Sequence, residues 1–263
     1  MANDLMAGKR GLIMGLANDK SIAWGIARTL ADAGAELAFS YQGDALKKRV
    51  DPLAAQLGSD LVLPCDVGSE ESIDALFTAL GERWDGIDFI VHAIGFSDKN
   101  ELRGRYVDTS RANFAMSMDI SVYSFTAVMQ RAEKMMKSGG SAVTLTYYGA
   151  EKVMPHYNVM GVAKAALEAS VKYLAEDLGK DGIRVNAISA GAMRTLSLAG
   201  IRGGKSLMGT GRDWSLLKED TRMEGVAGAA LYLLSELGHS VAGEVHHVDA
   251  GFHVVGVPDL PEE

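Results

Sequence analysis

The sequence predicts an α/β protein of the doubly wound class, with one parallel sheet of about seven strands and helices on both faces. Two observations lead to this prediction. Short apolar runs alternate with amphipathic helical stretches along the whole chain, the pattern of parallel strands joined by crossover helices. The 263 residues, 48% hydrophobic and 23% charged, are enough to bury one large core. We therefore expect a single domain.

The expected elements follow one another closely. In chain order they are strand 11–14, helix 22–33, strand 36–41, helix 44–57, strand 61–64, helix 70–82, strand 87–93, helix 111–136, strand 141–147, helix 158–179, strand 184–189, helix 224–235 and strand 244–248. The segment 192–221 is rich in glycine and lacks a clear period, which is more typical of a functional lid than of a structureless loop. A doubly wound sheet binds its ligand outside the carboxyl ends of the strands.

Charge and cysteine usage exclude several classes of function. A net charge of −8 argues against a surface that follows nucleic-acid phosphates, so we expect no nucleic-acid partner. Cys65 is the single cysteine, which excludes an intrachain disulfide and a four-cysteine metal site. We expect no metal, a buried thiol and a reducing cytoplasm. Acidic and basic residues interrupt the first ten positions, and no apolar run approaches the roughly 18 residues that span a bilayer, so neither export nor a membrane is expected.

The loop after the first strand has the context of a dinucleotide site. Gly15 and Gly25 bracket a loop that opens the first helix, where a pyrophosphate can meet backbone N–H groups. The spacing is longer than in G-x-G-x-x-G. The Ser21 hydroxyl can serve a phosphate or cap the helix, and a plain strand-helix turn is the alternative.

Gln42 ends the second strand, where an acid usually indicates NAD and a nearby arginine NADP. A neutral glutamine followed by Asp44 provides no cation for a 2′-phosphate. NADH is therefore favoured, unless Lys47 or Lys48 reaches the site. The alternative for Gln42 is an ordinary turn residue.

The third and fourth strands end in further candidates for cofactor binding. Asp66 can accept from an adenine amino group while the next backbone N–H, of Val67, pairs with a ring nitrogen. Asp66 can instead cap the helix that begins near Ser69. Gly95 lets the backbone approach a ribose. His92 is expected to be a structural histidine.

Tyr157 and Lys164 are seven residues apart on a predicted helix, two turns apart on nearly the same face. A nearby ammonium is expected to lower the pKa of the phenol from about 10 and can also hold ribose hydroxyls. Such a tyrosine can donate to a developing oxyanion. Tyr147 ends the fifth strand and brings a second phenol to the same edge, although buried tyrosines often merely pack. Tyr148 should point to the other side.

Five runs of sequence together resemble bacterial enoyl-acyl-carrier-protein reductases, a divergent branch of the short-chain dehydrogenases, over roughly residues 7–256. The runs are S-I-A-W-G-I-A, S-Y-Q-G, H-A-I-G-F, T-Y-Y-G-A-E-K-V-M-P-H-Y-N-V-M-G-V-A-K and R-V-N-A-I-S-A-G. The resemblance implies a Rossmann-like subunit, usually in a homotetramer. It also implies one dinucleotide-binding catalytic domain over residues 1–263, with a substrate-binding lid at 192–221.

The same resemblance implies a reaction and its residues. An enoyl chain on acyl carrier protein would take a hydride from NADH at its β-carbon, giving an enolate that Tyr157 stabilises and that is then protonated at the α-carbon. The residues implied to contact NADH are Gly15, Ser21, Ile22, Gln42, Asp66, Val67, Gly95, Lys164 and Met193. Those implied to face the thioester are Tyr147, Tyr157 and Phe96. Lys164 would anchor the cofactor ribose, and Tyr147 would shape the pocket.

Three features separate the chain from ketone-reducing relatives: the G-x-x-x-G-x-G loop is absent, H-A-I-G replaces N-N-A-G, and Ser121 stands where a catalytic asparagine is usual. The lid departs from the enoyl-reductase pattern at Ala192, Glu219 and Asp220. Two alternatives stay open. One is a reductase of 3-oxoacyl thioesters or ketones, and the other is a non-catalytic NAD-binding protein.

Basic residues in the lid are expected to meet the carrier protein, which is acidic. Arg202 and Lys205 stand where this contact is implied. A more acidic lid is expected to change chain-length preference or to weaken this docking. The sequence leaves the acyl chain length open.

Overall fold

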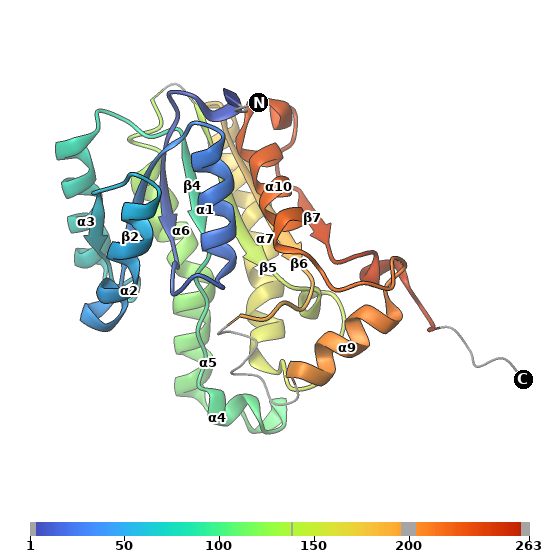
Figure 1. Ribbon diagram of the computed structural model, residues 1–263. Coiled ribbons are helices and arrows are strands. Elements are labelled where there is room, and N and C mark those ends of the chain that lie inside the picture. The colour runs from blue at the N-terminus through green and yellow to red at the C-terminus, as the bar shows by residue number, and fades with distance from the viewer. Residues whose placement is uncertain (1–3, 138, 196–203, 259–263) are drawn as a thin grey trace, which may run out of the picture.

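The computed structural model describes residues 4–137, 139–195 and 204–258. They form a seven-stranded sheet of order β3-β2-β1-β4-β5-β6-β7 in which all neighbouring strands are parallel (Figure 1). The strands are β1 Arg10–Met14, β2 Glu36–Tyr41, β3 Val62–Pro64, β4 Phe89–His92, β5 Gly140–Thr146, β6 Ile183–Ala190 and β7 Val245–Val248. The strand order reverses between β1 and β4, which confirms the doubly wound prediction.

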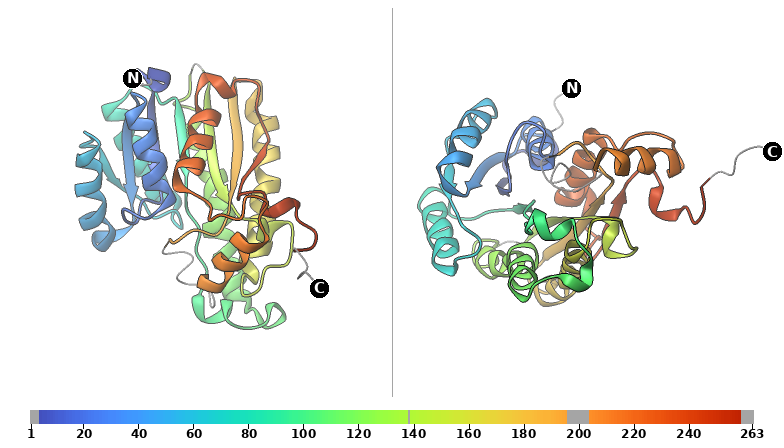
Figure 2. Two further views of the ribbon diagram at one scale, coloured as in Figure 1. Left: turned by 45° about the vertical axis from the view of Figure 1, so that its right-hand side comes forward. Right: turned by 90° about the horizontal axis from the view of Figure 1, so that it is seen from below.

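Helices cover both faces of this sheet, and each face has its own core (Figures 1 and 2). The helices over one face are α1 Ile22–Asp32, α2 Gly43–Gln56 and α10 Met223–Leu234. Those over the other are α3 Glu70–Arg83, α6 Ser124–Ala132 and α7 Val159–Gly179. Successive strand residues alternate between the faces, so Ile13 packs in the first core while Leu12 and Met14 pack in the second.

The predicted helix 111–136 is wrong as one element. It is divided into α5 Arg111–Met118, a π-helical turn Asp119–Tyr123 and α6. The Ser124 hydroxyl donates to the carbonyl of Ile120 at 2.7 Å, a side-chain bond that competes with regular helical bonding. Such π-helical turns change the direction in which side chains point, and they occur often at functional sites.

Other elements differ from the sequence prediction near the carboxyl ends of the strands. Helix α7 begins at Val159, so Tyr157 lies before it rather than on it. Two further helices, α4 Lys99–Leu102 and α9 Gly204–Trp214, were not predicted. Both lie beyond the carboxyl ends of the strands (Figures 1 and 2). The short 3-10 turns are Asp4–Met6, Tyr106–Asp108, Tyr148–Ala150, Glu236–Gly238 and Phe252–Val254.

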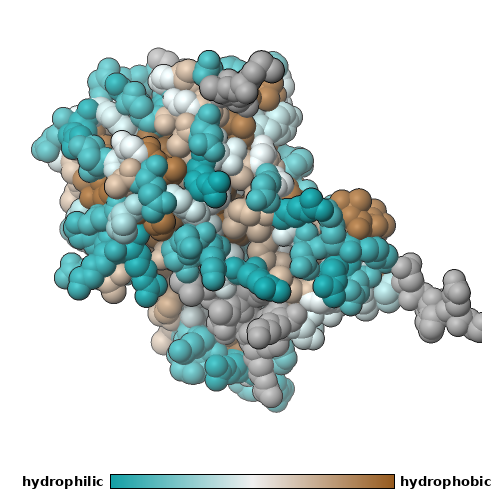
Figure 3. Space-filling model, viewed as in Figure 1, coloured by the Kyte–Doolittle hydropathy of each residue, from teal (hydrophilic) through white to brown (hydrophobic). Residues whose placement is uncertain are grey.

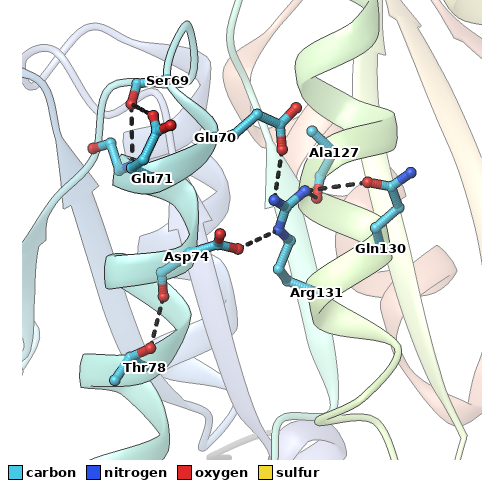
Figure 4. Close-up of polar contacts among 9 residues, drawn as sticks. Ser69, Glu70, Glu71, Asp74, Thr78, Ala127, Gln130 and Arg131 are labelled. Atoms are coloured by element: carbon cyan, nitrogen blue, oxygen red, sulfur yellow. Dashed lines mark hydrogen bonds and ion pairs between the residues drawn. The ribbon is translucent and has the colours of Figure 1, made fainter.

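Arg131 ties α6 to α3 on the outside of the second core (Figure 4). Its guanidinium donates to Asp74 at 2.8 Å and to Glu70 at 2.5 Å, both on α3, and also to the carbonyl of Ala127 at 3.1 Å. A planar guanidinium can satisfy several acceptors at once. Arg131 thus holds two helices of one layer in a fixed relation.

The surface seen in Figure 3 is mostly hydrophilic, with an apolar patch on the right of the view. Exposed apolar side chains in the C-terminal segment include Val254 and Val257. Within the described ranges, no helix combines the length and apolarity needed to cross a membrane.

Gly11 is expected to be irreplaceable in the centre of the sheet. An added Cβ would lie 2.1 Å from the ring of the fully buried Phe89 on β4, so Gly11→Ala should lower the free energy of unfolding by about 1–3 kcal/mol. Urea denaturation followed by circular dichroism measures this. Gly81→Ala on α3 is the control: its Cβ would meet no described atom within 4 Å, and the change should raise stability by about 0.5–1 kcal/mol. A Gly11→Ala protein as stable as the wild type contradicts this packing.

Candidate active site

A cavity of about 480 Å³ opens at the carboxyl ends of β1, β4, β5 and β6. Nine of the residues expected at a functional site line it. They are Gly15, Ser21, Ile22, Gly95, Phe96, Tyr147, Tyr157, Lys164 and Met193. Residues spread over most of the chain therefore meet at the point where the strand order reverses.

The loop after β1 can form only with glycine at its first position. Gly15 has φ +91, and a Cβ there would lie 2.1 Å from the carbonyl oxygen of Ala93. Ser21 occupies the N-cap position of α1, but its hydroxyl donates to the carbonyl of Asn18 at 2.7 Å and makes no cap bond. The capping role considered for Ser21 is therefore wrong. The N-terminus of α1 faces the cavity through Ile22.

Gln42, Asp66 and Val67 are not among the residues that line the cavity. They lie just past the ends of β2 and β3, on the same edge of the sheet, where Gln42 and Asp66 are exposed. The role of helix cap considered for Asp66 is wrong, because Ser69 caps α3 by accepting from the backbone N–H of Ser72 at 3.2 Å. An adenosine group can reach this edge without entering the cavity.

Lys47 is already paired in the structure. Its ammonium donates to Asp51 at 2.7 Å and lies 5.7 Å from the centre of the Tyr41 ring. Because the Lys47 ammonium is paired with Asp51, it is not directed at the position of a 2′-phosphate, which favours NADH over NADPH.

Tyr157 and Tyr147 face each other edge to face, with ring centres 5.0 Å apart and an interplanar angle of 74°. Burial raises the pKa of Tyr157 well above its ordinary value, and Tyr147 and Glu168 add to the rise. The expected lowering of this pKa is wrong, because loss of hydration on burial disfavours the charged phenolate and is the largest effect. Burial, and next the charge of Asp249, raises the pKa of Tyr147 to about 12. Both phenols stay protonated at neutral pH and act as hydrogen-bond donors.

Lys164 is 7% exposed and donates from Nζ to the carbonyl of Leu145 at 2.8 Å. Burial lowers its pKa to about 8, against the opposing charge of Glu168. The lysine is therefore mostly charged at neutral pH. An ammonium has three donors, so the bond to Leu145 leaves donors for the hydroxyl groups of a ligand. A Cβ at Gly95 would lie 3.5 Å from Nζ, so the glycine keeps this space open.

His92 is structural, as expected. It is fully buried, with Nδ1 3.1 Å from the Thr144 hydroxyl and Nε2 3.0 Å from the Ser124 hydroxyl. Burial, and next the charge of Lys164, lowers its pKa to about 3. A neutral imidazole thus bridges the hydroxyl groups of Thr144 and Ser124 in the core.

Ser121 has a role that the sequence did not suggest. From the π-helical turn, its hydroxyl accepts from the backbone N–H of Phe96 at 2.9 Å and donates to the Phe96 carbonyl at 3.1 Å. Ser121 thereby fixes the backbone beside Gly95, where ketone-reducing relatives place an asparagine. The Phe96 side chain itself is 53% exposed at the rim of the cavity.

Several cavity residues were missed by sequence reasoning. Lys99 and Leu102 come from the short helix α4, which has no periodicity to detect, and Leu207 comes from α9. Met160 also lines the cavity. Its position four residues before Lys164 on α7 was a usable signal, because residues at that spacing share a helix face.

Part of the expected lid 192–221 belongs to this cavity. Ala192 and Leu207 line it, and Glu219 pairs with Arg222. Asp220 lies on a small neighbouring pocket. Residues 196–203, including Arg202, and the side chain of Lys205 lie outside the described residues. In the described ranges no group of three or more His, Cys, Asp or Glu side chains is arranged to hold a metal ion.

Comparisons with known proteins give one answer. A family model described as "Enoyl-(Acyl carrier protein) reductase" matches residues 15–253. The chain is 63% identical to "Enoyl-[acyl-carrier-protein] reductase [NADH] 1" of Rhizobium meliloti (strain 1021), over 99% of this chain and 97% of the relative. The crystal structure of FabI from Candidatus Liberibacter asiaticus superposes with a TM-score of 0.96 at 52% identity, covering 98% of this chain and 100% of the other. The crystal structure of the Anaplasma phagocytophilum enoyl-acyl-carrier-protein reductase in complex with NAD superposes with a TM-score of 0.94 at 58% identity. It covers 97% of this chain and 98% of the other.

The buried ammonium is expected to weaken the cofactor-free fold at neutral pH. Burial lowers the pKa of Lys164 from its ordinary 10.5 to about 8 in the folded chain, so charging it costs the folded state about 3 kcal/mol below pH 8. This cost fades as pH rises from 8 to 10.5, because the unfolded chain then also loses the proton. Lys164→Met should therefore be more stable than the wild type by up to about 3 kcal/mol at pH 7. Urea denaturation across this range measures the difference, and a difference independent of pH contradicts the depressed pKa.

Proposed function

The chain belongs to the enoyl-(acyl carrier protein) reductase family, and we infer that Tyr157, Lys164 and Tyr147 carry its reaction at the cavity. It is an NADH-dependent oxidoreductase that reduces the double bond of an enoyl thioester in fatty-acid elongation. The observation that supports the assignment of residues is the meeting of the buried Tyr157, the partly buried Tyr147 and the buried ammonium of Lys164 in one cavity at the switch point.

The shape of the cofactor site fits a dinucleotide. Gly15 and Gly95 leave backbone exposed where a side chain would fill the space, and the N-terminus of α1 suits a pyrophosphate. Bound NADH supplies the hydride. We assign its binding to Gly15, Ser21, Ile22, Gln42, Asp66, Val67, Gly95, Lys164 and Met193. Lys164 offers its free donors to ribose hydroxyls.

Tyr157 stabilises the charge that forms on the substrate. When the β-carbon gains a hydride, the electron pair of the double bond moves toward the thioester carbonyl, whose oxygen becomes an enolate. The protonated phenol of Tyr157 donates a hydrogen bond to that oxygen, and its raised pKa keeps the proton on the phenol. The charge of Lys164 favours the same species. Protonation of the α-carbon then completes the reduction.

Tyr147 shapes the substrate pocket. Its ring fixes the edge of the Tyr157 ring, and its pKa of about 12 makes it a poor source of protons at neutral pH. Phe96 lies at the rim, where an acyl chain can pack against its exposed ring. We assign 192–221 as the substrate-binding lid, supported by Leu207 on the cavity wall.

The partner of the enzyme is an acyl carrier protein that bears the enoyl chain, and its contact with this chain belongs to the same proposal. We also propose a homotetramer. Supporting it are exposed large side chains on α5, on the π-helical turn and on α7, namely Phe114, Tyr123, Val162 and Tyr173. The single cysteine supports a cytoplasmic location.

Reduction of a 3-oxoacyl thioester is the alternative reaction. It needs a compact donor such as serine at position 147 to bind the ketone oxygen, and the position holds Tyr147 instead. Ser121 also binds backbone rather than replacing the asparagine of ketone-reducing relatives. Both differences favour the enoyl substrate.

The purified protein is expected to oxidise NADH in the presence of a short trans-2-enoyl thioester, followed by absorbance. NADPH and a 3-oxoacyl thioester, tested in parallel, should give much slower rates. Activity with the 3-oxo substrate alone overturns the proposed function. NADH binding without turnover of either substrate favours a non-catalytic protein.

Tyr157→Phe and Lys164→Ala should separate chemistry from cofactor binding. Loss of the phenol donor should lower kcat about 10²–10³-fold while the Kd for NADH stays nearly the same. Lys164→Ala should lower kcat and weaken NADH binding together, because the lysine holds the ribose. Steady-state kinetics and fluorescence titration measure both effects. Equal NADH affinity in the two variants would contradict the assigned roles.

A further inference from the structure

The turn that carries Tyr157 has an unusual backbone on both sides of the tyrosine. His156 has φ +60, and Asn158 has φ +49 with ψ −129. L-residues rarely adopt these angles, whereas glycine adopts them readily. Strained backbone of this kind persists where the surrounding structure holds it, commonly at functional sites. Tyr157 therefore lies between two residues that sit in unfavourable conformations.

Asn158 does not cap the helix that follows it, although it occupies the N-cap position. It occupies the N-cap of α7, where asparagine is among the preferred residues because its side chain accepts from the first turn of the helix. No such cap bond forms. The amide is turned away from its own helix and used elsewhere.

The Asn158 amide binds the end of α4 and the segment that follows it through both of its N–H groups and its oxygen. Nδ2 donates to the carbonyls of Glu101 and Gly104, each at 3.2 Å. Oδ1 accepts from the Thr109 hydroxyl at 3.2 Å. Carbonyl oxygens can only accept, so the amide nitrogen must face them. Asn158 thus holds three points along residues 101–109.

The start of this segment contributes to the cavity wall. The two carbonyls bound by Asn158 flank Leu102, which is 7% exposed and packs in one cluster with Tyr157 and Met160. Lys99 and Leu102 both line the cavity. One side chain therefore connects the turn that carries Tyr157 to the segment that carries Leu102, and none of its hydrogen bonds goes to a residue that we assign to NADH.

We propose that Asn158 is a positioning residue of the reductase, which sets the distance between Tyr157 and the wall formed by residues 99–109. The proposal rests on the proposed function. Asn158 acts through Tyr157 and Leu102 on the thioester, and its bonds leave the cofactor side untouched. Loss of its amide is therefore expected to alter the KM for the enoyl thioester far more than the affinity for NADH.

Asn158→Gly and Asn158→Asp test the amide directly. Glycine suits the backbone angles but removes the side chain, and aspartate keeps the size but cannot donate to the two carbonyls. Both variants should raise the KM for a short trans-2-enoyl thioester about 10-fold, because loss of these hydrogen bonds changes an equilibrium constant by roughly tenfold. The Kd for NADH should stay within about twofold of wild type. Asn158→Ala, which also loses the favourable backbone, should lower kcat in addition.

His156→Gly is the matched control. It relaxes the strained position on the other side of Tyr157, and His156 is exposed with no side-chain hydrogen bond to the described part of the chain. Its KM should stay within about threefold of wild type. If His156→Gly raises the KM as much as Asn158→Gly does, the effect comes from backbone flexibility beside Tyr157, and the proposal is overturned.

Thr109→Val removes one bond to Asn158 and keeps the side-chain shape. It should raise the KM about threefold. In the Asn158→Gly background it should have no further effect, because Asn158→Gly has already removed the bond between Thr109 and Asn158. If Asn158→Gly does not fold, a wild-type KM in Thr109→Val and Asn158→Asp overturns the proposal.

Thermal midpoints separate positioning from plain stability. A lower midpoint with unchanged kcat and KM in the Asn158 variants means that the residue is structural, and the proposal fails while the proposed function stands. Absence of turnover in the wild-type protein with the enoyl substrate is the distinct result that removes the proposed function.

Discussion

The parallel pairing of β1 with β4 is the constraint on which the active site depends. The backbone N–H of Ala93 donates to the carbonyl of Met14 at 3.0 Å, and the chain then turns away at Gly15 so closely that a Cβ would overlap the Ala93 carbonyl. From this point the crossovers run in opposite directions, so the crossover helices leave a crevice at the carboxyl ends of the two strands. The crevice left there receives the loops that follow β4, β5 and β6, with Gly95, Tyr147 and Met193.

Burial decides the protonation states in that crevice. Loss of hydration disfavours every charged form, so the pKa of the tyrosines rises and the pKa of His92 and Lys164 falls. At neutral pH the phenols remain donors, the imidazole is neutral, and the lysine keeps most of its charge. This combination suits a reaction in which negative charge appears briefly on a thioester oxygen, because the site offers donors and an ammonium beside it.

The two sides of the cavity are built differently. The cofactor side rests on strand ends and on a helix N-terminus, which the sheet holds rigidly. The substrate side rests on short helices and loops, α4 and α9 among them, whose positions depend on individual hydrogen bonds. Asn158 and Ser121 provide such bonds from α7 and from the π-helical turn. A site of this kind can vary in acyl specificity while its cofactor binding stays constant.

The sequence by itself determined the alternation of strands and helices, the doubly wound class and the nine predicted residues that meet on the cavity. Hydrophobic periodicity and glycine positions are local signals, and strand ends in a parallel sheet necessarily meet at one edge. The tertiary structure decided what depends on distant neighbours. The start of α7 after Tyr157 and the helix α9 follow from contacts that no local pattern contains. The pKa of Tyr157 was predicted in the wrong direction because the sequence shows that Lys164 is near but not how deeply the phenol is buried. Burial is a property of the packed whole, and here it outweighs the charge of a neighbour.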